Sequence, residues 1–354
     1  MQTVVGLMSG TSMDGIDAAL VRTDGHDRVE PVAFLTIPYD DDFRARLRSC
    51  LGGGGPVTAV EGELTRRHAD AVRRLLADAG VAADAVDLLG FHGHTILHAP
   101  EQRRTWQIGD GALLARETGI AVVDDFRGAD VRAGGQGAPL VPLFHRALAS
   151  CLEGPVAVLN VGGVANVTWI GRDGAVVAGD TGPGNALLDD WVLAHAGRRY
   201  DAHGDLARTG GIDAVALTEL LDHPYFDRPL PKSLDRDAFD PAPVRHLAPA
   251  DGAATLTAFT AFAVERVLPH LPEAPTRWLV CGGGRHNRTL MEMLADRLRA
   301  PVAPVEDLGW DGDALEAQAF AYLAVRSRLG LPLSLPTTTG VPAPLSGGRF
   351  HAAA

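Results

Sequence analysis

The stretch "GLMSGTSMDGID", from Gly6 to Asp17, joins two apolar runs near the start of the chain. These runs, Val4–Leu7 and Ile16–Val21, predict the two strands of a β-hairpin with a polar tip. Glycines allow backbone amides to approach a ligand closely, and the hydroxyl side chains between them supply further donors. The tip is a candidate cradle for a phosphate group, although an ordinary glycine-rich turn fits this stretch alone equally well.

Two common nucleotide-binding loops are excluded at this position. A Walker-type loop needs Gly-Lys-Ser/Thr, but the only lysine of the chain is Lys232, far downstream. The glycines also lack the G-x-G-x-x-G spacing of a dinucleotide-binding turn, and an apolar run stands where its helix should begin. A phosphate held here would depend on backbone amides and hydroxyls.

Length and composition indicate a globular protein with a small-molecule site. The chain has 354 residues, of which 46% are hydrophobic and 21% charged, enough for two domains with their own cores. Its net charge of -12 disfavours nucleic acid and anionic membrane surfaces as partners. Three widely spaced cysteines, no signal-like N-terminus and no apolar run near 20 residues favour a cytoplasmic protein without a membrane segment.

The first half of the chain alternates between strand and helix patterns. Strands are predicted at residues 30–39, 85–93 and 119–126, and helices at residues 40–51, 57–79 and 139–152. The segment "HGHTILH", residues 92–98, is expected to be a polar loop at the end of its strand.

The pattern resets at Pro155, where a second strand, glycine turn and strand open the other half of the chain. A third strand with a turn at Gly182 leads to a helix begun by Asn185. Residues 200–243 are expected to be loops, and residues 336–354 to pack loosely. Helices are predicted at residues 253–271 and 312–329, with a strand, glycine turn and helix at residues 276–298.

Seven ordered motifs carry a family resemblance between about Val4 and Gly340. They are "GLMSGTSMDGID", "HGHTILH", "DDFRGADVRAGGQGAPL", "LNVGGVANVT", "GDTGPGN", "CGGGRHN" and "GDALEAQAFAYLA". Together they resemble the anhydro-N-acetylmuramic acid kinases, a branch of the superfamily that includes sugar kinases, hsp70 and actin.

The resemblance implies an α/β protein with the two-domain actin-like ATPase (ribonuclease H-like) fold and an interdomain cleft. Residues 1–140 and 326–354 would form a sugar-side domain with the first phosphate hairpin. Residues 141–325 would form a second domain with the other hairpin, the catalytic residue and the adenosine motif. The resemblance also implies a homodimer.

The implied reaction uses ATP and 1,6-anhydro-N-acetylmuramic acid, a product of cell-wall turnover. Its 1,6-anhydro ring has no free hydroxyl at C6, so water must open it at C1 while O6 receives the γ-phosphoryl group. The resemblance assigns the base that deprotonates this water to Asp180 of "GDTGPGN". The alternative for Asp180 is that it caps the turn or the following helix.

The resemblance also assigns the nucleotide contacts. The first segment runs through Gly10, Thr11, Ser12, Met13, Asp14, Gly15, Ile16 and Asp17. Gly162, Gly163 and Asn166 would form a second phosphate-facing tip, and Gly282, Gly283 and Gly284 a surface beside the adenosine. Phosphoryl transfer needs Mg2+, for which either Asp14 or Asp17 is the candidate ligand.

The sugar contacts are expected from His92, His94, Arg127, Gly182 and Asn185. The lactyl carboxylate of a muramic acid needs a cation or an array of amides, for which Arg127 and Arg132 are candidates. The chain departs from the family pattern at His94, where glutamine is expected, and at Arg132 and Arg285, where small residues are expected.

Two other functions are compatible with parts of the sequence. His92, His94 and His98 have a spacing that suits a metal-dependent hydrolase, but such a site needs further ligands on later strands. A nucleotide-binding sensor without turnover is the other, and the presence of Asp180 argues against it.

Overall fold

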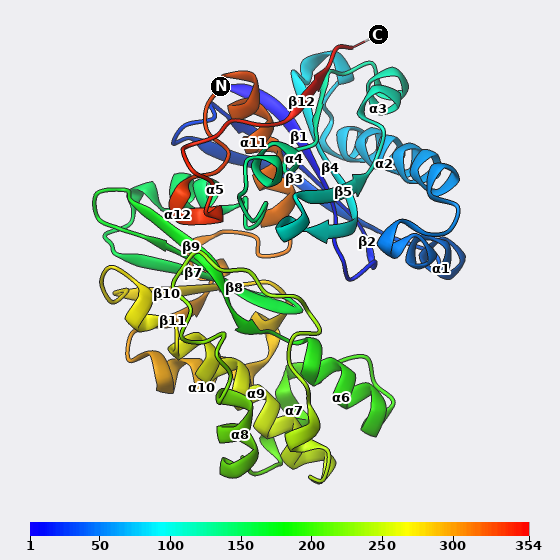
Figure 1. Ribbon diagram of the computed structural model, residues 1–354. Helices are drawn as coiled ribbons and strands as arrows, with labels where there is room; N and C mark the ends of the chain where they lie inside the picture. Colours follow the sequence, from blue (N-terminus) through cyan, green and yellow to red (C-terminus); the bar gives the residue numbers. More distant parts are fainter. Residues whose placement is uncertain (354) are drawn as a thin grey trace. The chain divides into compact units, whose positions relative to one another are not determined.

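The computed structural model describes residues 1–353, and its internal contacts divide the chain into two compact units (Figure 1). The first unit comprises Met1–Ser150 and the residues from Ala314 onward, and the second comprises Cys151–Asp313. The chain therefore passes between the units twice, after Ser150 and after Asp313.

The first unit is built on a mixed sheet with the order β12-β6-β4-β1-β2-β3, and β5 pairs with β4. Strands β1, β2 and β3 are antiparallel, whereas β4 is parallel to β1 and β6 is parallel to β4. The bounds are β1 (Gln2–Ser9), β2 (Gly15–Thr23), β3 (Val29–Pro38), β4 (Leu88–Ala99), β5 (Arg104–Ile108), β6 (Val122–Asp124) and β12 (Arg349–His351).

The second unit repeats this arrangement in the sheet β11-β10-β7-β8-β9. Again three antiparallel strands are followed by two parallel ones, so both sheets have the spatial order 3-2-1-4-5 in their central strands. The bounds are β7 (Val156–Val161), β8 (Val164–Ile170), β9 (Val176–Pro183), β10 (Arg277–Cys281) and β11 (Val302–Pro304). This order is that of the ribonuclease H-like fold, so the predicted α/β class with two such sheets is confirmed.

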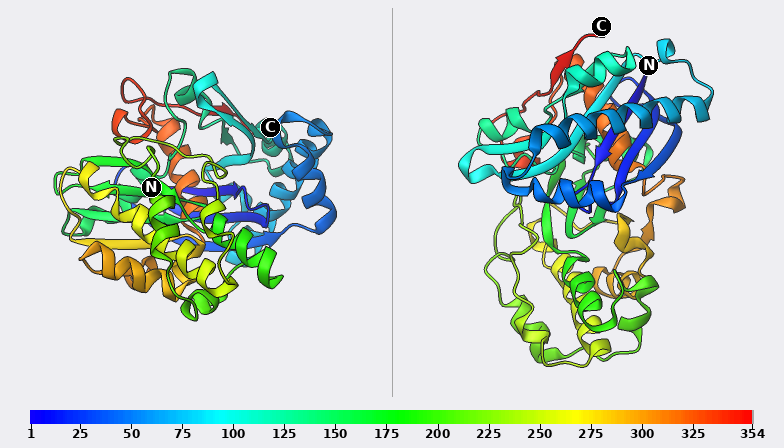
Figure 2. Two further views of the ribbon diagram at one scale, coloured as in Figure 1. Left: turned by 60° about the horizontal axis from the view of Figure 1, so that its bottom comes forward. Right: turned by 90° about the vertical axis from the view of Figure 1, so that its right-hand side faces the viewer.

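Helices cover both faces of the first sheet (Figure 2). Successive strand residues point to opposite faces, and Leu7 of β1 and Phe91 of β4 belong to the core that includes α2. Their neighbours Gly6 and Gly90 lie against the backbone of α11, where any side chain would overlap Ala317 or Phe320. The helices are α1 (Asp41–Ser49), α2 (Val57–Ala79), α3 (Gly111–Thr118), α4 (Gly128–Arg132), α5 (Pro142–Leu148), α11 (Leu315–Arg328) and α12 (Pro336–Thr339).

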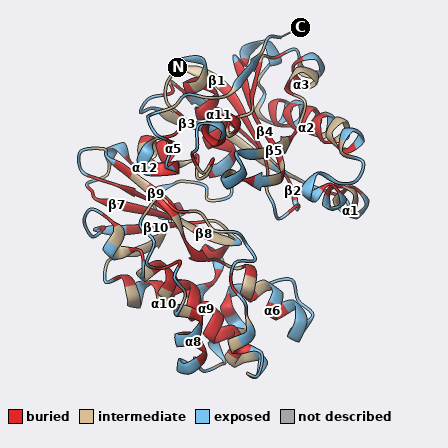
Figure 3. Ribbon diagram, viewed as in Figure 1, coloured by how far each residue is buried: buried red, intermediate tan, exposed pale blue. Residues whose placement is uncertain are grey.

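The second unit has a buried central helix, α9, between two apolar cores (Figure 3). One core joins α9 to the sheet and α10, and the other joins it to α6 and α8. The helices are α6 (Ala186–Ala196), α7 (Asp205–Arg208), α8 (Ala214–Leu221), α9 (Pro249–Glu265) and α10 (Arg288–Leu298). Across residues 1–353, no helix combines the length and the apolar character needed to cross a bilayer.

Most predicted elements are confirmed, but three expectations are wrong. The segment "HGHTILH" is the second half of β4, because it pairs with β5 in a hairpin. The expectation that residues 336–354 pack loosely is wrong for β12, which pairs with β6, and for Arg349, which binds the buried Asp124. Residue 354 lies outside the described residues. The expected loops at residues 200–243 include α8, which Asp213 caps through the amide of Ala216.

Candidate active site

In the first unit, the tip between β1 and β2 presents polar side chains on a fixed backbone. Thr11, Ser12 and Asp14 are exposed, whereas Met13 is buried in the core and has a positive φ of 55°. The amide of Met13 donates to the carbonyl of Gly10 at 3.0 Å, and the Ser12 hydroxyl donates to Asp14 at 2.8 Å. The amides of Thr11 and Ser12 have no acceptor within residues 1–353, so they are available to a ligand.

Tyr39 and Arg44 hold this tip from beneath. The amide of Tyr39 donates to the carbonyl of Asp14 at 2.9 Å, and Nε of Arg44 donates to the carbonyl of Met13 at 3.0 Å. Gly15 starts β2 with its Cα so close to Ile37 of β3 that a Cβ would lie 2.4 Å from the Ile37 carbonyl oxygen. The backbone of the tip is therefore held in place by contacts within the protein.

A buried hydrogen-bonded group lies at the base of the tip. Ser9 Oγ lies 2.8 Å from Tyr39 Oη and 3.0 Å from Nδ1 of His94, which is its neighbour across the β1–β4 pairing. His94 is fully buried, and its Nε2 has no partner among the described atoms. Burial lowers the pKa of His94 to about 4, so its ring is neutral near pH 7. In this position His94 supports the loop from within the sheet.

The two candidate magnesium ligands differ in their surroundings. Asp14 is exposed at the tip, whereas Asp17 lies within β2 and accepts a hydrogen bond from Thr36 of β3 at 2.6 Å. Carboxylate oxygens suit Mg2+, which usually takes one or two protein carboxylates together with water and substrate phosphates. The donor chemistry of the tip therefore fits a nucleotide-bound Mg2+, and the choice between Asp14 and Asp17 stays a prediction.

Arg127, which is half-buried, and the buried His92 form a hydrogen-bonded pair at the start of α4. Nε of Arg127 donates to Nε2 of His92 at 2.9 Å, and Nη1 donates to the carbonyl of Gly137 at 2.7 Å. Because arginine always donates, the proton of neutral His92 is on Nδ1, which lies 2.9 Å from the carbonyl of Gly93. Nη2 of Arg127 has no acceptor in the described part of the chain, so it can still bind an anion.

Glu316, at the start of α11, belongs to the same charged group. Desolvation by the surrounding protein raises its pKa, with Arg127 acting in the opposite direction and Asp14 adding to the increase. The sequence motif that contains Glu316 was recognised, but not this residue's place near Arg127 and Asp14. These three residues are far apart in the sequence, so only the fold brings Arg127 and Asp14 close enough to influence Glu316.

In the second unit, Asp180 lies on the edge strand β9, opposite Asn166 of β8. Its Oδ2 accepts a hydrogen bond from the amide of Leu234 at 2.7 Å, and Oδ1 has no partner within residues 1–353. Burial raises the pKa of Asp180 to about 7, while the Leu234 amide and the charge of Lys232 lower it. On β8, Oδ1 of Asn166 is buried and has no partner among the described residues. Both side chains therefore keep an unused acceptor atom on neighbouring strands.

Three predicted glycine turns of the second unit meet at one end of its sheet. The amides of Gly184 and Asn185 donate to the carbonyls of Gly163 and Gly162 at 2.9 and 2.8 Å. Gly282 has a positive φ of 74°, and a Cβ there would lie 2.2 Å from Oδ1 of Asn160. With Gly182 paired to Ala165 of β8, the structure brings these predicted residues into one region: Gly162, Gly163, Gly182, Asn185, Gly282, Gly283 and Gly284. Their contacts with ligands stay predictions.

Comparison with known proteins places the chain in a family. A profile of that family, anhydro-N-acetylmuramic acid kinase, matches residues 2–352. The anhydro-N-acetylmuramic acid kinase of Rhodospirillum rubrum is 59% identical over 356 residues, which cover 99% of this chain and 94% of the relative. The one of Paramagnetospirillum magneticum is 58% identical, covering 98% of this chain and 99% of the relative.

The chain belongs to the anhydro-N-acetylmuramic acid kinase family. It is therefore a carbohydrate kinase, and membership in this family supports ATP as the phosphoryl donor. Among solved structures, it is similar to a xylulose kinase from Lactobacillus acidophilus, with 10% identity, a TM-score of 0.46 and coverage of 100% of this chain and 94% of that one. A ROK family glucokinase from Streptomyces griseus has 14% identity, a TM-score of 0.39 and coverage of 91% and 99%.

The geometry of this kinase gives no support to the metal-dependent hydrolase. Both ring nitrogens of His92 are used, His94 is buried, and Nδ1 of His98 lies 3.0 Å from the Thr105 hydroxyl. Within residues 1–353, no group of three or more His, Cys, Asp or Glu side chains is arranged to hold a metal ion.

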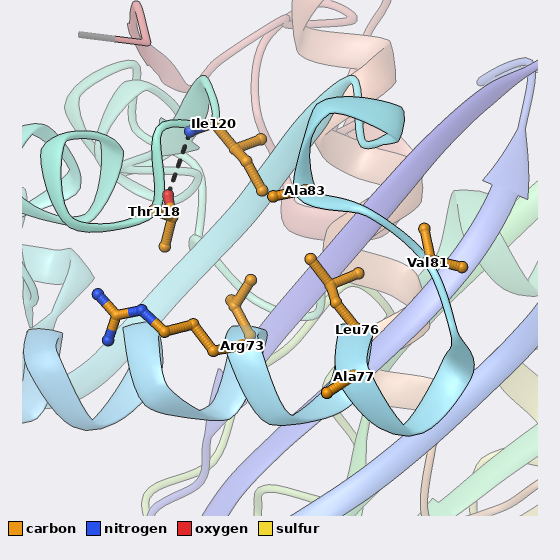
Figure 4. Close-up of a pocket in the computed structure, with 8 residues that line it drawn as sticks. Arg73, Leu76, Ala77, Val81, Ala83, Thr118 and Ile120 are labelled. Atoms are coloured by element: carbon orange, nitrogen blue, oxygen red, sulfur yellow. Dashed lines mark hydrogen bonds between the residues drawn. The ribbon is translucent and has the colours of Figure 1, made fainter.

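A hollow in the first unit also lies apart from these residues (Figure 4). It is formed by the end of α2 and the turn before β6, and it is lined mainly by apolar side chains such as Leu76, Val81 and Ile120. Arg73 at its edge binds Glu117. The hollow contains no acid–base group suited to phosphoryl transfer.

Sequence reasoning missed the segment that surrounds Asp180. Tyr225, Lys232 and Leu234 all contact Asp180 or its backbone, from a stretch expected to be loops without assigned roles. The one signal in the sequence was the presence of lysine at position 232 in a chain that otherwise uses arginine.

Proposed function

We propose that this kinase phosphorylates 1,6-anhydro-N-acetylmuramic acid with ATP and opens its anhydro ring with water, giving N-acetylmuramic acid 6-phosphate and ADP. The names of its close relatives support this substrate. A role in recycling cell-wall sugars in the cytoplasm and a homodimeric state belong to the same proposal. Sedimentation of the purified protein tests the homodimer.

The proposed reaction has a defined balance of bonds and protons. Water adds to C1 as the C1–O6 bond breaks, and O6 forms a bond to the γ-phosphorus of ATP. The bond between the γ-phosphorus and the β,γ-bridging oxygen breaks to release ADP. One proton of the water must be removed, and Asp180 is the proposed acceptor.

The observation that supports this role best is the environment of the Asp180 carboxylate. The Leu234 amide fixes Oδ2 and leaves Oδ1 without a partner among the described residues. The pKa of about 7 is suited to a general base near neutral pH, since the ionised form is populated and basic enough to accept a proton. The contacts do not favour the alternative that Asp180 caps α6, because its carboxylate accepts the Leu234 amide and the N-cap residue of α6 is Asn185, whose side chain donates to the Val161 carbonyl.

The remaining residues have proposed binding roles. The amides of Thr11 and Ser12 and the glycine turns of the second unit would bind the phosphates and the nucleoside of ATP. Asp14 or Asp17 would hold Mg2+, which offsets the negative charge of the phosphates when it is bound. Arg127, oriented by His92, would bind the lactyl carboxylate through Nη2.

Product analysis in H2(18)O tests the proposed reaction. We expect ADP release only with Mg2+ and the anhydro sugar, one (18)O atom at C1 of the product and none in its phosphate. Rapid reduction of C1 after quenching limits later exchange, and preformed product incubated in the same water is the control. Label in the phosphate, or ADP release with ordinary hexoses but not the anhydro sugar, would refute the proposal.

A further inference from the structure

Among the 32 lysine and arginine residues of the chain, Lys232 is the only lysine. Every other basic position has arginine, whose charge is permanent and whose planar group needs several acceptors. Lysine differs in having a compact ammonium group on a flexible stem. The surroundings of Lys232 can therefore show why lysine is used at this position.

The Lys232 side chain is buried and is held by backbone carbonyls. The residue is 3% exposed, and Nζ donates to the carbonyls of Tyr225 at 3.0 Å and Phe226 at 3.4 Å. Nζ also lies 4.5 Å from the centre of the Tyr225 ring, within the range of a cation–π contact. No ion pair with a carboxylate is formed among the described residues. Burying an ammonium group without a direct counterion costs folding free energy, so we expect Lys232 to have a role that offsets this cost.

The segment Tyr225–Leu234, here called the covering segment, wraps around Asp180. Its two ends both contact this residue: the Tyr225 hydroxyl donates to the Asp180 carbonyl at 2.7 Å, and the Leu234 amide donates to Oδ2 at 2.7 Å. Between them, the carbonyl of Lys232 accepts a hydrogen bond from the Asp180 amide at 2.8 Å. All three groups that hold Asp180 in place therefore come from one short stretch of chain.

Close packing fixes the covering segment on the edge of the second sheet. Strand β9 is the edge strand, and Gly179 next to Asp180 has no side chain. A Cβ at Gly179 would lie 3.0 Å from both the amide nitrogen and the carbonyl oxygen of Lys232. The backbone of Lys232 can pair with β9 only because this space is empty.

We propose that Lys232 is a positioning residue for Asp180, whose ammonium group ties the two ends of the covering segment together and keeps a positive charge beside the carboxylate. By binding the Tyr225 and Phe226 carbonyls, it closes the loop that presents the Leu234 amide to Oδ2. By its charge, it favours the ionised carboxylate. The proposal rests on the proposed role of Asp180 as the base.

The charges around this pair determine the sign of the expected pH effect. The pKa of Lys232 is lowered to about 8, mainly by burial and also by Arg228, while Asp227 and Asp180 act in the opposite direction. Besides Lys232, the titratable side chain that faces Asp180 is Tyr225, which is neutral because burial raises its pKa. Lys232 is thus the positive charge that opposes the effect of burial on Asp180. Removing it should raise the pKa of Asp180, so the base would need a higher pH to ionise.

The pH profile of kcat/KM for the anhydro sugar tests the proposal in K232M, K232R and the wild type. In K232M we expect the ascending limb to move upward by half a pH unit or more and kcat at pH 7 to fall at least tenfold, with KM for ATP changed less than twofold. K232R keeps the charge, so its limb should stay near the wild-type position even if kcat falls because the larger group fits poorly. R236M, in which an exposed arginine bound to Asp190 is removed, is the matched control and should retain the wild-type profile.

The possible failures can be told apart. A uniform loss of activity in K232M with an unmoved limb, or an equal shift in K232R, would overturn the electrostatic role of Lys232. Thermal unfolding of each variant shows whether the fold is retained. If D180N still shows the ascending limb of the pH profile, the assignment of Asp180 as the base is wrong. If D180N lacks this limb but K232M shows it at the wild-type position, only the inference about Lys232 fails.

Discussion

The two units have the same strand order but use different chemistry at the tips of their first hairpins. The tip of the first unit, Gly10–Asp14, has exposed hydroxyl and carboxylate groups that are held from beneath by Tyr39 and Arg44. The tip of the second unit, at Gly162 and Gly163, has no side chains, and its carbonyls accept the amides of Gly184 and Asn185.

The difference shows how one topology serves two purposes. A tip with side chains can bind phosphate oxygens and contribute a ligand to Mg2+, whereas a bare glycine tip lets neighbouring turns and a flat ligand approach the backbone. In the second unit, the proposed base is instead on the third strand, at Asp180. We therefore expect side-chain substitutions in the second unit to have large effects at Asp180 and small effects elsewhere around the glycine turns.

The largest effect is expected for Asp180→Asn. Loss of a general base lowers kcat by about 10³-fold, within the usual range for such groups. The Asn side chain keeps the carbonyl oxygen that accepts from Leu234, so ATP binding should remain within twofold of the wild type. Steady-state kinetics and calorimetric titration with ATP measure the two quantities. Asp190→Asn on the exposed face of α6 is the control. A wild-type kcat in D180N would contradict the expectation that the second unit acts through the side chain of Asp180.

The next effect concerns Arg127, a half-buried cation of the first unit. Arg127→Met removes a charged hydrogen-bond donor, and we expect KM for the anhydro sugar to rise about 10- to 100-fold. The increase should disappear with 1,6-anhydro-N-acetylglucosamine, which lacks the lactyl carboxylate. Arg74→Met is the control, because that side chain on α2 is largely exposed and lies 3.8 Å from Asp78, away from the candidate site. Equal loss with both sugars would indicate that Arg127 supports the fold instead.

Most of the fold and the glycine turns could be predicted because their signals are local. Apolar periodicity gave α2 as Val57–Ala79, and the glycine-rich turns mark the strand ends at which ligands bind in such folds. The second half of β4 was missed because its polar residues "HGHTILH" are typical of a loop, and only pairing with β5 makes them a strand. β12 was missed because Arg349 and Asp124 are separated by 225 residues, which no local pattern can reveal.

The sequence proposes the glycines and Asp180 as members of the candidate site, but it gives no sign of the groups that support them. The contacts of Tyr225 and Leu234 with Asp180 join residues 45 and 54 positions apart. The burial of His94 against Ser9 likewise depends on the β1–β4 register. Such supporting residues follow from tertiary packing, so a motif can propose a reacting group without indicating what sets its pKa.

A smaller effect is expected at the first tip, where it sharpens the comparison. Substitution of the true magnesium ligand, Asp14→Asn or Asp17→Asn, should raise the Mg2+ concentration for half-maximal activity about tenfold, and the other variant should change it little. Titration with Mg2+ at saturating ATP and sugar measures this. The matched control in the second unit is Asp173→Asn, in the turn between β8 and β9, where Asp173 only accepts the Ala175 amide. If neither tip variant alters the Mg2+ dependence, the first tip does not bind the metal through its carboxylates.

The smallest effect on catalysis is expected at Arg285, which supports the last glycine turn. Its side chain is 3% exposed and binds Glu306 at 2.8 Å, Asp313 at 2.9 Å and the carbonyl of Gly282 at 3.0 Å. Both carboxylates are largely exposed and would stay hydrated after Arg285→Met, so we expect a loss of unfolding free energy of about 2 kcal/mol, less than for a fully buried pair. Because the turn binds through its backbone, kcat should change less than threefold while KM for ATP rises modestly. Urea unfolding and kinetics measure both, with Arg172→Met, an exposed arginine near Glu273, as the control. A large fall in kcat with unchanged stability would mean that the glycine turn depends on a side chain for catalysis, and the contrast between the two units would be wrong.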